Sequence, residues 1–216
     1  MKRLIIYDLD GTLVDTKEDI AHAVNQMLGE FSAPLLSVEE VASHVGKGLR
    51  QLIEDCLKTH DPEQIERGMQ IYRTYYRAHL LDNTGLYPGA RQVLDYFKER
   101  KQAVITNKPN PYSKEILQAL GVNSYFVEII AGDSIYGRKP DPASVKMLLA
   151  REGVSREDAL LVGDSPIDVE TGRNAGVFTV GVAQGFSSEE ELISAGPDEM
   201  VDSLMEFLEL AKKRGW

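Results

Sequence analysis

The sequence has few of the features that mark secreted, membrane-spanning and nucleic-acid-binding proteins. Its one cysteine, Cys56, excludes an intrachain disulfide and a zinc site built from several cysteines. No apolar run approaches the ~20 residues that a membrane-spanning helix needs. Met1-Lys2-Arg3 leads directly into an apolar segment, without the longer leader of a signal peptide. We therefore expect a cytoplasmic protein with no membrane partner.

Positive charge is also scarce. Lys and Arg number 24 against 34 Asp and Glu, which gives a formal net charge of −10. This surplus of negative charge argues against nucleic acids and anionic membranes as partners, because both repel it. If the ligand is itself an anion, a cation must offset the carboxylates around it. The apolar content of 43% is ordinary for a globular protein, and 216 residues suffice to bury a core.

The chain opens on a short apolar segment that ends in two acidic residues. Residues 3–7 are apolar and partly β-branched, as buried strands are, and the run stops at Asp8. Asp10 follows, and Gly11 permits a tight turn directly after it. Ligands bind at the carboxyl ends of strands in open α/β sheets, so both carboxylates are candidates for a site. By itself, however, such a pair is more typical of a solvated turn.

A long helical segment separates this first strand from the next. The second convincing strand is at residues 102–106, a gap far longer than one βαβ crossover needs. Residues 16–82 fill the gap with apolar residues at helical spacing and with helix-capping signatures. We therefore expect an all-helical domain at 16–82, inserted into a core made of residues 1–15 and 83–216.

From residue 90 onward, strands and helices alternate. We expect strands at 102–106, 127–131, 159–162, 177–182 and 200–202, and helices at 90–100, 113–120, 142–152, 167–175, 188–195 and 203–213. This alternation predicts an α/β fold, with a Rossmann-like parallel sheet covered by helices on both faces.

Polar residues follow several of these strands. They are Asp8 and Asp10 after the first strand, Thr106 and Asn107 after the second, Lys139 beyond the third, and Asp164 and Asp168 after the fourth. Because parallel strands end at one edge of a sheet, these side chains are expected to meet in one crevice. Carboxylates this close raise one another's pKa unless a cation lies among them, and hard oxygen ligands suit Mg²⁺.

Each segment has a simpler interpretation when it is taken alone. Residues 106–109 are compatible with a plain turn, and Lys139 with a surface lysine before a helix. Asp164 and Ser165 are compatible with a helix cap, and Asp168 with the helix dipole. Their joint occurrence at successive strand ends favours a shared site.

Four segments, taken in order, resemble the motifs of the haloacid dehalogenase superfamily of phosphohydrolases. They are Asp8-Leu9-Asp10-Gly11-Thr12, Val104-Ile105-Thr106-Asn107, Arg138-Lys139-Pro140, and Gly163-Asp164-Ser165 with Asp168. The resemblance covers nearly the whole chain, and residues 16–82 look like the superfamily's helical cap domain. Within the superfamily the chain is most similar to the phosphoglycolate phosphatase group, in the segments 13–16, 106–109, 139–142 and 185–188.

The resemblance implies a role for each acidic residue. Asp8 would attack phosphorus and form an aspartyl-phosphate, and Asp10 would act as the general acid and base. Mg²⁺ would be held by Asp8, by Asp164 and by the backbone carbonyl of Asp10. Asp168 would support the metal from behind these ligands or contact it through water. Dehalogenases of the superfamily lack the acidic residue at position 10, so Asp10 argues for phosphate chemistry.

The remaining core motifs would hold the phosphoryl group. Thr106 and the backbone N–H of Asn107 would bind phosphate oxygens, and Lys139 would add fixed positive charge in the transition state. Lys139-Pro140 is in addition a candidate for a cis peptide bond.

Substrate choice is expected to lie in the cap. The loop with Gly46, Lys47, Gly48 and Arg50 opens a helix, and helix N-termini bind anions. Lys47 and Arg50 would add charge suited to a substrate carboxylate. The alternative is a solvent-exposed loop with two ordinary basic residues.

The expected function is Mg²⁺-dependent hydrolysis of a small phosphorylated metabolite, with phosphoglycolate as the first candidate. Alternatives within the superfamily are a pyrophosphatase, a sugar or nucleotide phosphatase and a β-phosphoglucomutase. A non-catalytic regulatory protein of the same fold is expected to have lost a motif residue, and here all are present. We expect a monomer or a homodimer.

Overall fold

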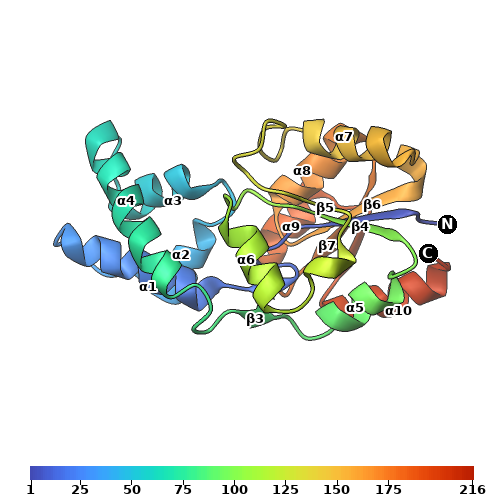
Figure 1. Cartoon of the computed structure of the whole chain (residues 1–216), viewed down its shortest axis with the longest axis horizontal. Helices are drawn as coiled ribbons and strands as arrows, with labels where there is room; N and C mark the ends of the chain where they lie inside the picture. The colour runs from blue at the N-terminus through green and yellow to red at the C-terminus, as the bar shows by residue number, and fades with distance from the viewer.

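The computed structural model describes all 216 residues, and it shows two regions side by side, a sheet with flanking helices and a group of helices (Figure 1). The sheet has six strands in the order β5-β4-β1-β6-β7-β8, and every pair is parallel. The strands are β1 (Leu4–Tyr7), β4 (Lys101–Ile105), β5 (Glu128–Ile130), β6 (Ala159–Gly163), β7 (Phe178–Val182) and β8 (Glu199–Val201).

Helices cover both faces of this sheet. They are α5 (Ala90–Tyr96), α6 (Tyr112–Ala119), α7 (Ala143–Glu152), α8 (Pro166–Ala175), α9 (Glu189–Ala195) and α10 (Leu204–Arg214). In Figure 1, α7 and α8 lie above the sheet and α5 and α10 below it. Leu4 and Ile6 pack into the apolar cluster that contains the α7 side chains, whereas Ile5 and Tyr7 pack into the cluster on the opposite face. All four β1 residues are therefore buried, which explains their continuous apolar run.

The second region is a helical insert, defined here as α1 to α4. Its helices are α1 (Lys17–Glu30), α2 (Val38–Ser43), α3 (Leu49–Leu57) and α4 (Pro62–Ala78). Side-chain N-caps mark the start of α2 and α4. The Ser37 side chain accepts a hydrogen bond from the Glu40 N–H, and the Asp61 side chain accepts one from the Glu63 N–H. Apolar side chains of the insert and of the sheet region form one continuous cluster.

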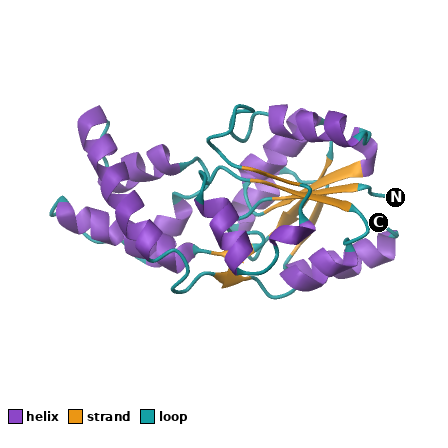
Figure 2. Ribbon diagram, viewed as in Figure 1, coloured by secondary structure: helices purple, strands orange, loops and turns teal.

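Two short strands and one buried carboxylate join the segments that enter and leave the insert. β2 (Val14–Asp15) pairs antiparallel with β3 (Gly85–Leu86), and Figure 2 shows this pair apart from the main sheet. Asp19, in the first turn of α1, is 1% exposed. Its carboxylate accepts hydrogen bonds of 2.7–3.0 Å from the backbone and side chains of Asn83 and Thr84.

The predicted α/β fold with a parallel sheet is confirmed, and each predicted strand and helix is present within a few residues of its expected bounds. The largest shift is in α5, which ends at Tyr96. The β2–β3 pair was not predicted, because strands of two residues are too short to show periodicity. The division into domains at 16 and 82 remains our proposal.

Two further features bear on the predictions. The Lys139-Pro140 bond is cis, as is Asn110-Pro111, which the sequence did not indicate. No helix is long and apolar enough to cross a membrane.

Candidate active site

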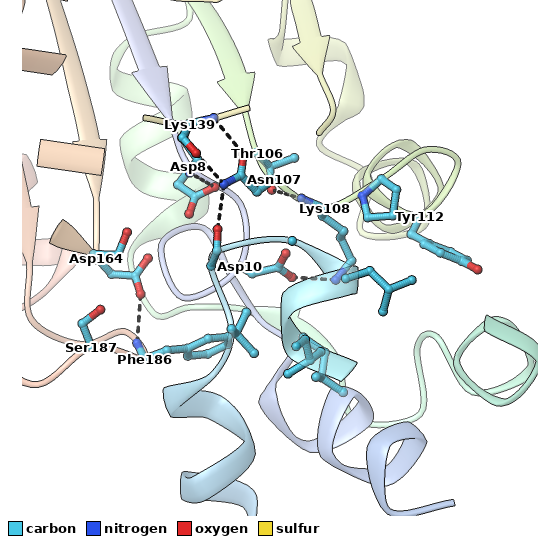
Figure 3. A pocket seen from close by; sticks show the side chains of 18 of the residues that line it. Asp8, Asp10, Thr106, Asn107, Lys108, Tyr112, Lys139, Asp164, Phe186 and Ser187 are labelled. Carbon is cyan, nitrogen blue, oxygen red and sulfur yellow. Dashed lines mark hydrogen bonds and ion pairs between the residues drawn. The ribbon is translucent and has the colours of Figure 1, made fainter. Parts of the chain in front are cut away.

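Three carboxylates meet at the carboxyl edge of the sheet. Asp8 directly follows β1, Asp164 directly follows β6, and Asp168 lies in the first turn of α8. The parallel register pairs Tyr7 with Val162, so β1 and β6 end within one residue of each other. One carboxylate oxygen from each of the three residues lies within 4.8 Å of the other two. The expected convergence of Asp8, Asp164 and Asp168 is therefore present (Figure 3 shows Asp8 and Asp164).

Lys139 lies between two of these carboxylates. Its ammonium nitrogen is 2.7 Å from Asp8 Oδ1 and 2.6 Å from Asp168 Oδ1, and the residue is buried. Asp168 Oδ2 in turn accepts hydrogen bonds from the hydroxyl and backbone N–H of Ser165. Both oxygens of Asp168 thus have protein donors, so this residue anchors Lys139 as well as adding charge to the cluster.

Asn107 holds the backbone of Lys139. Its side-chain oxygen accepts from the Lys139 N–H at 2.9 Å, and its amide nitrogen donates to the Lys139 carbonyl at 3.0 Å. The same amide nitrogen donates to the carbonyl of Gly46 in the insert at 2.7 Å. Asn107 therefore connects the sheet edge, the lysine loop and the insert, a role that the sequence did not reveal.

Burial and mutual repulsion set the electrostatics of the cluster. Burial, aided by Asp168 and Asp164, raises the pKa of Asp8 well above its ordinary value despite the opposing charge of Lys139. Burial and Asp168 raise the pKa of Asp164 to about 7. Burial lowers the pKa of Lys139, but Asp168 and Asp8 outweigh it, and the net shift is upward. The cluster thus has three acidic side chains and one lysine in contact with two of them.

A divalent cation fits this arrangement. The three carboxylates offer hard oxygen ligands close together, and the raised pKa values of Asp8 and Asp164 are what an unneutralised cluster gives. A cation among them would favour the ionised forms. The carboxylate of Asp10 is not part of this cluster, and its expected contribution through the backbone carbonyl remains a prediction.

Asp164 is held in place by contacts that the sequence analysis did not assign. Its Oδ1 accepts from the Thr12 hydroxyl at 2.7 Å, and its Oδ2 accepts from the Phe186 N–H at 2.9 Å. Gly11 has a φ of +85°, and a Cβ there or at Gly185 would overlap the Asp164 side chain. Two glycines therefore allow this carboxylate to sit against the backbone.

Asp10 has partners different from those of Asp8. Its Oδ1 accepts from the Thr16 hydroxyl at 2.6 Å and lies 2.8 Å from Lys108 Nζ. The Lys108 side chain is only 5% exposed, and Figure 3 shows its ammonium group turned toward Asp10. The sequence places Lys108 only within a motif-like turn, residues 106–109. A lysine directly after two assigned motif residues is the one signal that pointed to it.

The sheet edge and the insert enclose a cavity of about 60 Å³. Its charged lining residues all come from the sheet region: Asp8, Asp10, Lys108, Lys139 and Asp164. The insert contributes only uncharged residues: Ile20, Val45, Gly46, Gly48, Leu49, Leu52, Tyr72 and Tyr76. The remaining lining includes Thr106, Asn107, Pro109, Tyr112, Ser165 and Phe186.

The predicted substrate loop is only partly at this cavity. Gly46 and Gly48 line it, but Lys47 and Arg50 are exposed and do not. Gly46, Gly48 and Leu49 thus face the cavity, whereas the two basic side chains are exposed to solvent. Their role in substrate choice stays a prediction, without support from their position.

The fold and the site define a known class of enzyme. The sequence profile of the family described as haloacid dehalogenase-like hydrolase matches residues 5–182. The chain belongs to this family, so the predicted membership is confirmed.

Proteins of similar sequence and structure narrow the type of hydrolase to the phosphatases. A phosphoglycolate phosphatase of Pseudomonas savastanoi is 34% identical over 96% of this chain and 79% of its own length. One of Vibrio parahaemolyticus is 32% identical over 96% of this chain and 95% of its own length. A crystal structure of a predicted phosphoglycolate phosphatase from Haemophilus somnus has a TM-score of 0.90, with 28% identity, and covers 97% of this chain and 98% of that chain. The chain is therefore an enzyme of the phosphatase type, as expected.

Proposed function

We propose that this phosphatase hydrolyses phosphoglycolate through an aspartyl-phosphate on Asp8, with Mg²⁺ as its metal. The observation that carries the mechanism is that Asp8 and Asp10 have different surroundings. Asp8 lies within the carboxylate cluster beside Lys139, whereas Asp10 lies outside it with Thr16 and Lys108. This difference supports the proposal that Asp8 attacks the phosphoryl group and that Asp10 transfers protons.

The first half-reaction breaks the ester bond. A carboxylate oxygen of Asp8 forms a bond to phosphorus, the bond from phosphorus to the ester oxygen breaks, and Asp10 gives that oxygen a proton. In the second half-reaction Asp10 takes a proton from water, and the resulting hydroxide attacks phosphorus and releases Asp8. A divalent cation held by Asp8, Asp164 and the Asp10 carbonyl would offset the repulsion between nucleophile and phosphate.

The phosphoryl oxygens are held by groups that surround Asp8. Thr106 is 3% exposed, lines the cavity, and directly follows β4 next to β1. The Asn107 N–H, beside it in the chain, is the second proposed donor. Lys139 lies within contact distance of Asp8, where negative charge accumulates on the phosphoryl group during transfer. Asp168 keeps the lysine there.

The substrate proposal is supported by the relatives. Two relatives that match most of the chain are phosphoglycolate phosphatases.

A panel of phosphate esters tests the proposal. Phosphoglycolate is expected to have a higher kcat/KM than pyrophosphate, hexose phosphates or nucleoside monophosphates. Protein stripped of metal by a chelator should be inactive, and Mg²⁺ should restore its activity. A clear preference for pyrophosphate or a sugar phosphate would contradict the substrate, and full activity in chelator would contradict the metal.

A further inference from the structure

The cavity contains one lysine whose bonding capacity is largely unused. Lys108 and Lys139 are its only cationic lining residues. Lys139 is committed to two carboxylates, Asp8 and Asp168. Lys108 has one anionic partner, Asp10, although an ammonium group carries three donors. The third donor of Lys139 is the one proposed for the phosphoryl group, so the two remaining donors of Lys108 are the cationic ones left for a further negative group of a ligand.

The surroundings of Lys108 offer no second acceptor. Its ammonium nitrogen lies 4.8 Å from the centroid of the Tyr76 ring, and that ring packs between Tyr72 and Tyr112. All three tyrosines line the cavity, and the Tyr76 hydroxyl is buried with no hydrogen-bond partner. An aromatic face attracts a cation but does not replace a hydrogen-bond acceptor. A lysine that is 5% exposed with one acceptor is a site at which an anion is favourable.

The wall of the cavity that the helical insert forms also favours Lys108 as the anion-binding residue. The helical insert presents no charged residue to the cavity, because Lys47 and Arg50 lie outside it. A negative group on the substrate, other than its phosphate, therefore has Lys108 as its one cationic partner in this space.

The contact with Asp10 places Lys108 at a defined point along the substrate. Asp10 is the residue proposed to touch the ester oxygen, and Lys108 touches Asp10 at 2.8 Å. Two hydrogen bonds that meet at one carboxylate oxygen keep the ammonium group within roughly 6 Å of the ester oxygen. A carboxylate one carbon away from that oxygen falls within this reach, whereas a longer chain would carry its carboxylate past the lysine.

We propose that Lys108 binds the substrate carboxylate and thereby selects phosphate esters of short hydroxy acids. This inference rests on the proposed function, because it explains how a phosphoglycolate phosphatase whose insert lines the cavity with uncharged residues recognises the glycolate end. The proposal places recognition of the substrate's carboxylate in the loop after β4, whereas the sequence suggested the insert. Lys108 is in this view the specificity-determining residue, and the tyrosines limit the length of the substrate.

Paired substrates and a matched variant test the inference. Phosphoglycolate and ethyl phosphate both have two carbons, and only the first has a carboxylate. Steady-state kcat/KM should be measured for both with the wild type, with Lys108→Met and with Lys114→Met, a control at an exposed lysine outside the cavity.

The ratio of the two kcat/KM values is the decisive readout, because any general disturbance of Asp10 affects both substrates. In Lys108→Met the preference for phosphoglycolate should fall by about 10- to 100-fold, the usual effect of removing a charged hydrogen-bond partner. Lys114→Met should leave the preference unchanged, and Lys108→Arg should keep most of it. If Lys108→Met folds poorly, Lys108→Gln, which retains a donor for Asp10, should show the same loss of preference.

The outcomes separate the two proposals. A wild type that does not prefer phosphoglycolate to ethyl phosphate overturns the proposed substrate. A wild type that prefers phosphoglycolate, together with Lys108 variants that keep this preference, overturns the role of Lys108 and leaves the substrate in place.

Discussion

The sheet region and the helical insert contribute to the cavity in opposite ways. Every charged residue that lines the cavity comes from the sheet region, and each is held by named partners such as Thr12, Thr16 or Asn107. The insert lines it with aliphatic side chains, glycines and two tyrosines. This comparison agrees with our proposals that the sheet region supplies the chemistry and the recognition of charge, whereas the insert shapes the cavity.

The largest expected effect concerns the nucleophile. Asp8→Asn removes the attacking carboxylate but preserves its volume, and we expect kcat to fall by roughly 10⁴-fold or more, as for other lost nucleophiles. Phosphate release from phosphoglycolate measures this. Asp202→Asn, at an exposed carboxylate far from the motifs, serves as the control. Normal turnover in Asp8→Asn would refute the assignment of chemistry to the sheet edge.

Asp10→Asn separates proton transfer from metal binding. Loss of a general acid and base should lower kcat by about 10²- to 10⁴-fold. Because the Asp10 carboxylate lies outside the cluster of Asp8, Asp164 and Asp168, Mg²⁺ affinity should stay close to that of the wild type. Calorimetric titration with Mg²⁺ measures that affinity, and its loss would show that Asp10 acts chiefly as a metal ligand.

Asp19 tests how the two regions are joined. Asp19→Asn removes an acceptor oxygen that faces the N–H groups of Asn83 and Thr84, so the free energy of unfolding at pH 7 should fall by about 1.5–3 kcal/mol. Glu66→Gln, at an exposed position of α4, is the control. Denaturant unfolding measures this difference in stability. No change would mean that the β2–β3 pair alone is enough to join the two regions.

The same variant has a defined pH dependence. Burial raises the pKa of Asp19, but hydrogen bonds from Thr84 and Asn83 outweigh it and hold the pKa below its ordinary value. The folded state thus favours the ionised form, and this stability is fully present above the unfolded pKa of about 3.9. It is lost as the pH falls through the lower folded value, so the wild type and Asp19→Asn should converge in acid. If the difference in the free energy of unfolding between the two proteins stays constant from pH 7 to pH 3, the stabilisation by Asp19 does not come from its ionised form.

The smallest effects are expected in the loop before α3. Lys47→Met and Arg50→Met remove exposed charges outside the cavity, so on the geometry described they should change the KM for phosphoglycolate by less than about threefold, as surface charges do. The sequence-based hypothesis predicts instead a large rise in KM for an anionic substrate and little change for an aryl phosphate. Measuring the KM for phosphoglycolate and for an aryl phosphate with each variant shows whether the insert or Lys108 recognises the negative charge of the substrate.

The sheet edge was predictable because simple rules govern it. A β-branched apolar run that stops at Asp8, and strands that alternate with helices, place polar residues at one edge without knowledge of their contacts. Asp8, Asp164 and Lys139 were located in this way. Only the structure shows that Asp168 anchors Lys139, because that depends on which oxygen faces which donor.

Recognition of the substrate was harder to predict because it depends on which side chains of irregular loops point inward. Lys47 and Lys108 are both lysines in polar turns, and the sequence does not distinguish the exposed from the buried one. The surroundings of Lys108 come from Asp10 and Tyr76, which lie far from it along the chain. Such long-range neighbours leave no periodic signal.

The Asn107 side chain has a practical consequence. Its amide nitrogen donates to Gly46 in the insert and to Lys139 in the sheet region, so its two hydrogens face two different parts of the molecule. In an NMR spectrum these hydrogens give separate resonances. If the insert swings away from the sheet, the resonance of the hydrogen bonded to Gly46 should shift while its companion stays in place. The Asn107 side chain thus reports movement of the insert away from the sheet in an NMR spectrum, without an added label.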